Sequence, residues 1–361
     1  MPTMTLTEPG MSQKAKLRGW MPGGDPHAGK PHEPAPHEID LPYPAIEELP
    51  EFVTRIESAD LSHGVRHYNG SIVRHGGRIF MAYRVESYRG VSSVGICELN
   101  GHFGVIRDAL LSPKVEQPSN IEDPHMGSVG GRLYVFLSHV ERRMTFGDPN
   151  ICRQRLFELD PETLGIAAEI PHTFGNVKGV EKNWTPFELP CGSLGFVYKQ
   201  DATRSTVRVH DAKGWTCVGA SMKPSGDSCS ISSRTQPLRI SKSMYLQFVG
   251  GHVRLSGRNN RGTRYWVGAV AFSSSEPFWT LGWTTEPLVW GSEASPTIHN
   301  PLPGGGHPIC ILPAGAMLDG HDILSSCGVN DSYNVILRYG IEALLGKMTG
   351  DVLAKWKGDF A

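Results

Sequence analysis

The chain has 361 residues, with 35 basic and 36 acidic side chains and a formal net charge of -1. This balance argues against non-specific electrostatic binding of nucleic acid or membrane, although it does not exclude a local basic patch. The 42 glycines and 27 prolines favour many turns over long helices, and 39% hydrophobic residues are enough for a substantial core.

The cysteines and the apolar segments indicate the cellular compartment and its redox state. None of the 7 cysteines stands in a Cys-x-x-Cys spacing, so neither a zinc knuckle nor a redox motif is indicated. Several lie in apolar runs such as Ile309-Cys310-Ile311, where a buried free thiol is expected. Without an N-terminal hydrophobic region or a run of about 18 apolar residues, we expect a cytoplasmic, reduced protein with no membrane partner.

Residues 1–45 are rich in Pro, Gly and His and have no sustained apolar period. We expect a flexible tail or a strap lying on the domain, because such a segment buries little surface. The alternative is a metal-binding tract of His27, His32 and His37, but regular spacing alone does not support it. Residues 46–58 are compatible with a short helix or a lead-in strand, and residues 46–361 are taken as one domain.

From residue 66 onward the sequence falls into five strand-rich units that recur at roughly 50 to 80 residues. Each unit opens on a polar or small-residue cluster, followed by a tight turn, an apolar strand and an alternating strand. The openings are Tyr68-Asn69-Gly70-Ser71, Glu122-Asp123-Pro124, Lys182-Asn183-Trp184-Thr185-Pro186, Arg234-Thr235-Gln236-Pro237 and Pro313-Ala314-Gly315-Ala316.

Repeats of this kind predict an all-β fold, a five-bladed β-propeller with loop insertions. A two-sheet sandwich with Greek-key links is the competing interpretation; it explains the strands but not the five similar openings. Residues 341–356 have apolar side chains at helical spacing, which predicts a short C-terminal helix packed on a blade edge.

In a propeller the innermost strand of every blade lines a central channel, so the five openings are expected to converge on one cleft. Carboxylates, basic groups and amides around such a cleft suit a sugar, because hydroxyls need donors and acceptors and a glycosidic bond needs a proton donor. Trp184, Tyr68 and His125 are candidates for packing on a sugar ring. The polar candidates are Asn69, Ser71, Arg84, Glu122, Asp123, Lys182, Asn183, Arg234, Thr235 and Asp331.

Four motifs stand in a familiar order, namely Tyr83-Arg84-Val85, Glu122-Asp123-Pro124, Lys182-Asn183-Trp184-Thr185-Pro186-Phe187 and Gly328-Val329-Asn330-Asp331. Over roughly residues 66–338 the chain resembles the five-bladed propeller glycosidases and phosphorylases. That family includes inverting β-mannoside phosphorylases and related mannosidases and mannosyltransferases. The resemblance implies that Asp123 is the general acid, and that Asn69, Ser71, Arg84, Lys182 and Asp331 hold the sugar. Glu122 and Asn183 join them as substrate-binding candidates.

An inverting phosphorylase uses phosphate as the attacking group, so basic side chains are needed in place of a second carboxylate. The candidates for binding phosphate or another donor are His125, Arg142, Arg153 and Arg234. His125 replaces the Arg that commonly follows Glu-Asp-Pro in the family, and Arg234 opens a run where Gly-Gly-Thr-Pro is common. We expect no metal and no cofactor, with inorganic phosphate or an activated sugar as co-substrate.

We therefore predict an enzyme that makes or breaks a glycosidic bond with inversion, a glycoside phosphorylase or glycosyltransferase, acting on a sugar or glycan. A hydrolase is the first alternative and needs a base for water, for which Glu122, Glu181 and Asp331 are candidates. A non-catalytic propeller that binds a glycan or a polyanion is the second. A basic loop contains Arg254, Arg258, Arg261 and Arg264, so a polyanionic acceptor is a possible partner. A homo-oligomer is possible as well.

Overall fold

The computed structural model describes residues 43–57, 60–64, 66–87, 92–113, 120–140, 152–171, 181–200, 205–211, 214–220, 232–254, 263–292, 294–295 and 309–360. Residues 1–42, which contain nearly all of the expected tail, lie outside these ranges, and so do its three histidines.

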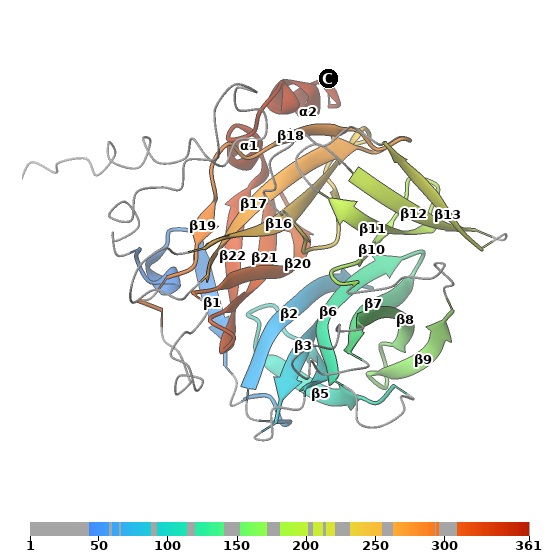
Figure 1. The fold of residues 1–361 in the computed structure, drawn as a ribbon, viewed down its shortest axis with the longest axis vertical. Helices are drawn as coiled ribbons and strands as arrows, with labels where there is room; N and C mark the ends of the chain where they lie inside the picture. The colour runs from blue at the N-terminus through green and yellow to red at the C-terminus, as the bar shows by residue number, and fades with distance from the viewer. Residues whose placement is uncertain are drawn as a thin grey trace, which may run out of the picture.

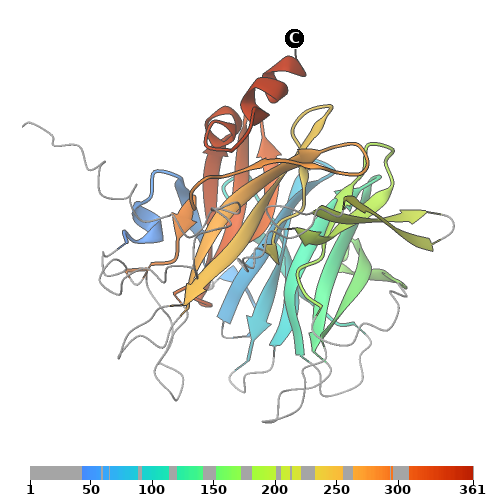
Figure 2. The ribbon, with the colours of Figure 1, turned by 45° about the horizontal axis from the view of Figure 1, so that its top comes forward.

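Strands dominate the described residues and form five antiparallel sheets, which Figures 1 and 2 show grouped around a common centre. Four of the sheets have the four-stranded form of a propeller blade. The first contains β2 (Arg66–His75), β3 (Arg78–Glu86), β4 (Ser92–Leu99) and β5 (Val105–Leu111). The second contains β6 (Asn120–Val129), β7 (Arg132–Val140), β8 (Cys152–Asp160) and β9 (Gly165–Ile170). The third contains β10 (Thr185–Glu188), β11 (Leu194–Gln200), β12 (Ser205–Asp211) and β13 (Gly214–Ala220).

The last regular sheet joins the two ends of the described chain. It contains β20 (Ile311–Asp319), β21 (Asp322–Val329), β22 (Tyr333–Gly340) and, on its outer edge, β1 (Phe52–Ile56). Phe52 pairs with Leu337 and Ile56 with Asn334. The lead-in segment is thus a short 3-10 helix, η2 (Ile46–Glu48), followed by a strand. Because the N-terminal strand completes the C-terminal sheet, the ring is closed by backbone hydrogen bonds.

The remaining sheet departs from the expected five similar units. Its six strands are β14 (Ser232–Ser233), β15 (Leu238–Arg239), β16 (Met244–Arg254), β17 (Thr263–Ser273), β18 (Thr280–Trp283) and β19 (Val289–Trp290). The long strands β16 and β17 pair with each other, while the short β14 and β15 share one edge and β18 and β19 the other. Between β14 and β15 the Phe248 N–H of β16 donates to the Thr235 hydroxyl at 3.1 Å in place of a backbone carbonyl, which interrupts the inner position. The all-β propeller prediction is confirmed, with four regular blades.

Apolar clusters between neighbouring sheets hold the ring together. Phe80 and Ile96 of the first sheet pack in one cluster with Met126 and Val135 of the second. Similar clusters link the second sheet to the third, the third to the irregular sheet, the irregular sheet to the last, and the last back to the first. Each fully buried large side chain contributes about 1.5–3 kcal/mol, so these interfaces dominate the stability.

The C-terminal segment forms two short helices, α1 (Ile341–Leu345) and α2 (Val352–Gly358), where one helix was predicted. Between them the chain runs beside the irregular sheet, where the Thr349 N–H donates to the Trp283 carbonyl at 2.8 Å, and Gly350 has φ 69°. Leu344 and Val352 join the apolar cluster of the irregular and last sheets, and the Trp356 indole donates to the carbonyl of Ile240 at 3.1 Å. Packing on a blade edge is therefore confirmed.

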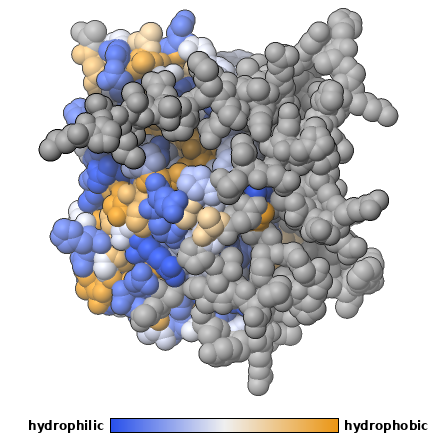
Figure 3. Space-filling model, turned by 90° about the vertical axis from the view of Figure 1, so that its left-hand side faces the viewer, coloured by the Kyte–Doolittle hydropathy of each residue, from blue (hydrophilic) through white to orange (hydrophobic). Residues whose placement is uncertain are grey.

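None of the helices in the described ranges is long and apolar enough to cross a membrane. On the face turned to the viewer in Figure 3, hydrophobic and hydrophilic side chains lie in small interspersed patches.

Candidate functional site

Residues in the left-handed backbone region interrupt two first strands, β2 and β6, and lie just before a third, β10. Asn69 in β2 has φ 52°, Asp123 in β6 has φ 46°, and Asn183 just before β10 has φ 65°. Asn and Asp tolerate this conformation better than other side chains. The β2–β3 register shifts between Tyr68 and Ser71, and the β6–β7 register shifts between Glu122 and His125. These bulges turn polar side chains out of the ladder. Strands β2, β6 and β20 contact one another there, and β10 contacts β6.

Buried side chains of neighbouring sheets bind the backbone groups that the bulges release. The Gly70 N–H donates to Asn334 Oδ1 at 2.7 Å, and the Met126 N–H donates to the Ser71 hydroxyl at 2.9 Å. Gly328 leaves space for the Asn69 side chain, since a Cβ there would lie 2.1 Å from Asn69 Oδ1. Ser71, expected to bind substrate, is fully buried between two sheets and holds the second bulge.

Two carboxylates and two cations form the core of the site. Lys182 Nζ lies 2.9 Å from Glu122 Oε2 and 3.8 Å from Asp123 Oδ2. Arg84 lies 3.3 Å from Glu122 Oε1 and 3.6 Å from Asp123 Oδ1, so both cations bridge both acids. Asn69 Nδ2 donates to Asp123 Oδ1 at 3.0 Å. The Asp123 side chain keeps 15% of its surface exposed, so a small polar ligand can reach it.

This cluster fixes the charge of Asp123. Burial opposes its ionisation, but Arg84, Lys182 and Arg234 outweigh burial, and together with the Asn69 hydrogen bond they hold the pKa of Asp123 well below its ordinary value. Asp123 is therefore a carboxylate at neutral pH.

Asp331 belongs to the same electrostatic cluster but behaves in the opposite way. It lies in the turn between β21 and β22, where Asn330 and Asp331 both have positive φ, 49° and 47°. The Asn330 side chain accepts from the Cys310 N–H and donates to the carbonyls of Ser292 and Ser295, which fixes the turn. Burial raises the pKa of Asp331 to about 6, opposed by Arg84 and reinforced by Asp123.

Arg234, Asn183 and His125 form a second group beside Asp123. Arg234 Nη1 donates to Asn183 Oδ1 at 3.1 Å, and Gly250 gives the arginine room, because a Cβ there would lie 3.2 Å from Arg234 Cγ. Unlike Arg84 and Lys182, Arg234 makes no ion pair with any carboxylate in the part of the chain that the structure describes. His125 is only 2% exposed; burial, and then the charge of Arg234, lower its pKa to about 4.

Three other sequence candidates are buried, and their side chains are taken up by contacts within the fold. Trp184 packs in the core between the second and third sheets and stacks on Phe196 at 4.9 Å, so it is not available to a sugar ring. Tyr68 is buried, with its hydroxyl donating to Glu86 at 3.1 Å and Arg84 over its ring. Thr235 is fully buried, and its hydroxyl accepts the Phe248 N–H.

The basic candidates from the sequence do not lie together in the structure. Arg142 lies outside the described residues, and Arg153 is exposed on β8, the third strand of its sheet. Arg264 is buried against the ring of Tyr43, 4.6 Å from its centroid, so it does not belong to an exposed basic loop. Arg258 and Arg261 lie outside the described residues, and Arg254 is the last residue of β16.

Sequence reasoning missed Ser92 and Glu86, which support the cluster. The Ser92 hydroxyl accepts two hydrogen bonds from Arg84, at 2.8 and 3.1 Å, and Glu86 pairs with Arg66 at 3.2 Å. A signal was available, because Arg84 and Glu86 stand two apart on one strand and therefore share a face.

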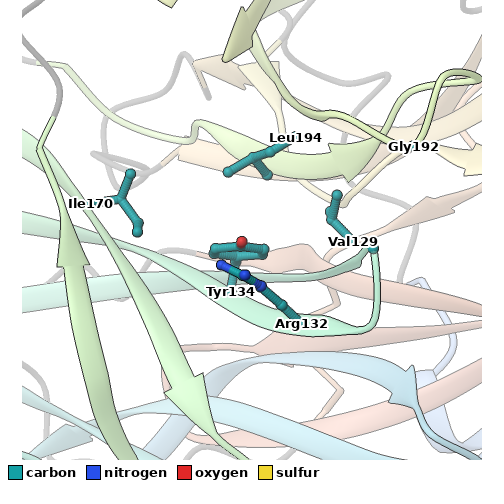
Figure 4. Close-up of a pocket in the computed structure, with 7 residues that line it drawn as sticks. Val129, Arg132, Tyr134, Ile170, Gly192 and Leu194 are labelled. Atoms are coloured by element: carbon teal, nitrogen blue, oxygen red, sulfur yellow. The ribbon is translucent and has the colours of Figure 1, made fainter. Parts of the chain in front are cut away.

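The described residues contain no group of three His, Cys, Asp or Glu side chains placed to hold a metal ion, and the expectation of a metal-free protein stays a prediction. Figure 4 shows a separate pocket between the second and third sheets. It lies at the Val129 end of β6, whereas Glu122 and Asp123 lie near the other end, and it contains no member of the cluster. Its lining residues are Val129, Gly130, Arg132, Tyr134, Ile170, Gly192 and Leu194.

No family model matches the sequence, and no curated protein gives a significant match. Solved structures do match. A β-1,2-mannobiose phosphorylase from Listeria innocua, in complex with β-1,2-mannobiose, has a TM-score of 0.55 at 13% identity, over 80% of this chain and 94% of that chain. A protein from Parabacteroides distasonis, provisionally assigned as a glycoside hydrolase, has a TM-score of 0.55 at 12% identity, over 77% and 88%. A glycosyl hydrolase from Bacteroides ovatus has a TM-score of 0.50 at 12% identity, over 80% and 91%. At these identities the likeness establishes a shared fold.

Proposed function

We propose that this protein makes or breaks a glycosidic bond with inversion, as a glycoside phosphorylase or glycosyltransferase, with Asp123 as the general acid and base. The proposal also includes five blade positions around one channel, four of them regular blades and the fifth occupied by the irregular sheet. The observation that carries it is the placement of one partly exposed carboxylate, Asp123, among three cations and an amide at the meeting point of the inner strands. The folds shared with a mannobiose phosphorylase and a glycosyl hydrolase support the same class of chemistry.

In the cleaving direction, a phosphate oxygen attacks the anomeric carbon from the face opposite the glycosidic oxygen. The bond between that carbon and the leaving oxygen breaks, and the oxygen takes its proton from the Asp123 carboxyl, directly or through a sugar hydroxyl. The products are a sugar 1-phosphate of inverted configuration and a free sugar. In the synthetic direction the Asp123 carboxylate removes the proton from the acceptor hydroxyl, which is the charge state found here.

The cleaving direction requires a protonated Asp123, although its neighbours favour the carboxylate. A bound phosphate adds negative charge beside the cations and so raises the pKa of Asp123. Arg234 is the residue we assign to this anion, because it makes no ion pair with a carboxylate among the described residues and lies close enough to affect Asp123. Lys182 and Arg84, in contrast, are engaged by Glu122.

Glu122, Asn69, Asn183 and Asp331 are assigned to binding the sugar. Their amide and carboxylate groups offer the mixture of donors and acceptors that sugar hydroxyls require. Mannose is the first sugar to examine, because the phosphorylase with the shared fold is bound to mannobiose.

A hydrolase is the second candidate, and one observation favours it. Asp331 is a second carboxyl in the same cluster, and its pKa of about 6 suits a base that activates water near neutral pH. Glu181 is a weaker choice because it accepts hydrogen bonds from Trp184 and Tyr198. An inverting hydrolase needs about 6.5–9.5 Å between its two carboxyl groups, to admit the water.

Turnover of β-mannosides in the presence and absence of inorganic phosphate separates the candidates. The proposal predicts phosphate-dependent release of a sugar 1-phosphate, with its anomeric configuration read by NMR before mutarotation, or transfer from an activated sugar to an acceptor. Release of free mannose without phosphate would identify the hydrolase. Binding without turnover of any β-mannoside, sugar phosphate or nucleotide sugar would contradict the proposal and favour a binding propeller.

A further inference from the structure

The Asp331 turn, residues 330–332 between β21 and β22, has a backbone conformation that its surroundings must hold. Asn330 and Asp331 follow each other in the left-handed region, with φ 49° and 47°. Residues other than glycine are uncommon there, and such strain persists only where the neighbouring structure over-determines it. The contacts that hold this turn therefore also set where the Asp331 carboxylate lies relative to Arg84 and Asp123.

The first side of the Asp331 turn is held by the Asn330 side chain. Its Nδ2 atom donates to the carbonyls of Ser292 and Ser295, each at 3.2 Å. The hydroxyls of the same two buried serines bind the chain that precedes β1. Ser292 Oγ donates to the Tyr43 carbonyl at 2.8 Å, and the Ile46 N–H donates to Ser295 Oγ at 2.9 Å. The N-terminal segment thus lies directly behind the residues that hold Asn330.

The second side of the turn is held by Tyr333, which is fully buried. Its hydroxyl donates to Glu47 Oε1 at 2.6 Å, a short bond to a charged acceptor. Ser295 Oγ donates to the other carboxylate oxygen, Glu47 Oε2, at 3.5 Å. The Arg55 guanidinium lies over the Tyr333 ring, 4.1 Å from its centroid. One oxygen of Glu47 therefore serves the Tyr333 side of the turn, and the other serves the Asn330 side.

The Glu47 contacts are separate from the closure of the ring. Closure comes from the backbone pairing of β1 with β22, over Phe52 to Ile56. Glu47 lies before that strand, in η2, and it reaches Tyr333 and Ser295 through side-chain atoms. A change of the Glu47 side chain can therefore loosen the Asp331 turn while β1 stays paired.

We propose that Glu47 is a positioning residue, which fixes the Asp331 turn through Tyr333 and Ser295 and so sets the place of the Asp331 carboxylate in the site. The inference rests on the proposed function, in which Asp331 binds the sugar. The N-terminal segment then belongs to the sugar-binding apparatus and does more than close the ring. Removal of the Glu47 oxygens leaves the buried Tyr333 hydroxyl without its acceptor, so the turn has to shift or admit water.

The first test needs no enzymatic activity. The full-length protein is labelled with 13C at the aspartate carboxyl carbons, and the Asp331 signal is assigned by its loss in Asp331→Asn. Burial is the largest cause of the raised pKa of Asp331, about 6, so a loosened turn should titrate at lower pH. We expect a lower midpoint in Glu47→Ala and in Tyr333→Phe, which removes the same hydrogen bond by deleting one oxygen and serves if Glu47→Ala does not fold.

Two further variants control this titration. Glu47→Gln keeps an oxygen that accepts from Tyr333 and should restore the wild-type midpoint of Asp331. Glu48→Ala changes the next residue of η2, which is exposed, and should leave the midpoint unchanged. A midpoint that is the same in the wild type, Glu47→Ala and Tyr333→Phe would overturn the inference. So would a wild-type midpoint at the ordinary value for aspartate, because the turn would then not hold Asp331 in a buried position.

The second test is turnover of β-1,2-mannobiose with phosphate. Glu47→Ala should raise the KM of the sugar about tenfold and leave the KM of phosphate unchanged, because Asp331 is assigned to the sugar and Arg234 to the anion. In the Asp331→Asn background the same change should add nothing, since both substitutions act on one contact. Additive losses, or equal changes in the two KM values, would contradict the inference.

Failure of this inference is distinct from failure of the proposed function. If the Asp331 midpoint does not move in Glu47→Ala while Asp123→Asn abolishes turnover, the inference falls and the proposed function stands. If Asp123→Asn leaves turnover unchanged, the proposed function falls, and the carboxyl titration still decides whether Glu47 holds the turn.

Discussion

Asn69 Nδ2 donates a 3.0 Å hydrogen bond to Asp123 Oδ1, and both residues occupy the same left-handed backbone region, with φ 52° and 46°. They stand at corresponding bulges of β2 and β6, the first strands of neighbouring sheets. The same local irregularity therefore occurs twice and brings an amide and a carboxylate together. Because each bulge is held by side chains of a neighbouring sheet, the position of Asp123 depends on the closure of the ring.

A substitution at Gly328 tests how tightly the Asn69 bulge is packed. In Gly328→Ala the new Cβ would lie 2.1 Å from Asn69 Oδ1 and 2.8 Å from its backbone nitrogen, which cannot move freely. We expect a loss of roughly 1–3 kcal/mol in the free energy of unfolding, measured by urea denaturation. Gly101→Ala is the matched control, because a Cβ there meets no atom within 4 Å. Equal losses in the two variants would contradict the packing argument.

Asp331 should make stability depend on pH in an unusual direction. Its pKa is about 6 in the folded protein against an ordinary value of 3.8, so between these pH values the folded state holds a proton that the unfolded chain has lost. This contribution to stability is present at low pH and is lost as pH rises through about 6. Asp331→Asn cannot ionise, so the variant should gain stability relative to the wild type as pH increases from about 4 to about 7, followed by thermal denaturation.

The control for this measurement is Asp319→Asn, which changes an exposed carboxylate paired with Arg338. It should not show a gain that grows over the same pH range. A difference between wild type and Asp331→Asn that stays constant with pH would show that Asp331 ionises normally.

The pKa of Asp123 should depend on the cations beside it. In Arg84→Gln, the loss of the guanidinium 3.6 Å from Asp123 Oδ1 should raise the pKa of Asp123. For transfer in the synthetic direction, which needs the carboxylate, the midpoint of the acid limb of kcat/KM should move to higher pH. Arg78→Gln breaks a peripheral ion pair with Glu98 and should leave that midpoint unchanged. An acid limb that coincides in all three proteins would argue against Asp123 as the titrating group.

Arg234 and Arg153 were both candidates for phosphate, and the structure separates their positions. Arg234 lies beside Asp123 and Asn183, while Arg153 is exposed on β8. Arg234→Gln should weaken binding of inorganic phosphate about tenfold or more, measured by calorimetry at fixed ionic strength. Arg153→Gln should leave it unchanged. The reverse pattern would place the anion site elsewhere.

The sequence was informative where a local pattern has a local cause. Glu122-Asp123-Pro124 and Tyr68-Asn69-Gly70-Ser71 stood out as polar openings, and both prove to be bulges, because Asn and Asp are the residues that tolerate the left-handed region. Arg84 was one of the polar candidates for the cleft, and it does bridge both acids.

Features that depend on contacts distant in sequence could not be predicted. Whether Ser71 faces the cleft or the next sheet is decided by the Met126 N–H on another strand. Trp184 looked suited to a sugar ring, but Phe136 and Phe196 bury it. The pairing of β1 with β22 joins segments from opposite ends of the described chain, and residues 46–58 alone carry no sign of it.

The central claim is that Asp123 carries the proton in a glycosyl transfer. Its most direct test is turnover of β-1,2-mannobiose with phosphate, or of the sugar donor found active, by Asp123→Asn and by Asp108→Asn. Asp108 lies on the outer strand β5, and its carboxylate accepts hydrogen bonds from the Ser62 and Tyr83 hydroxyls. Its variant therefore controls for the loss of a hydrogen-bonded acid. We predict that Asp123→Asn lowers kcat by more than about a hundredfold with the fold retained, and that Asp108→Asn does not. Undiminished turnover by folded Asp123→Asn would contradict the account.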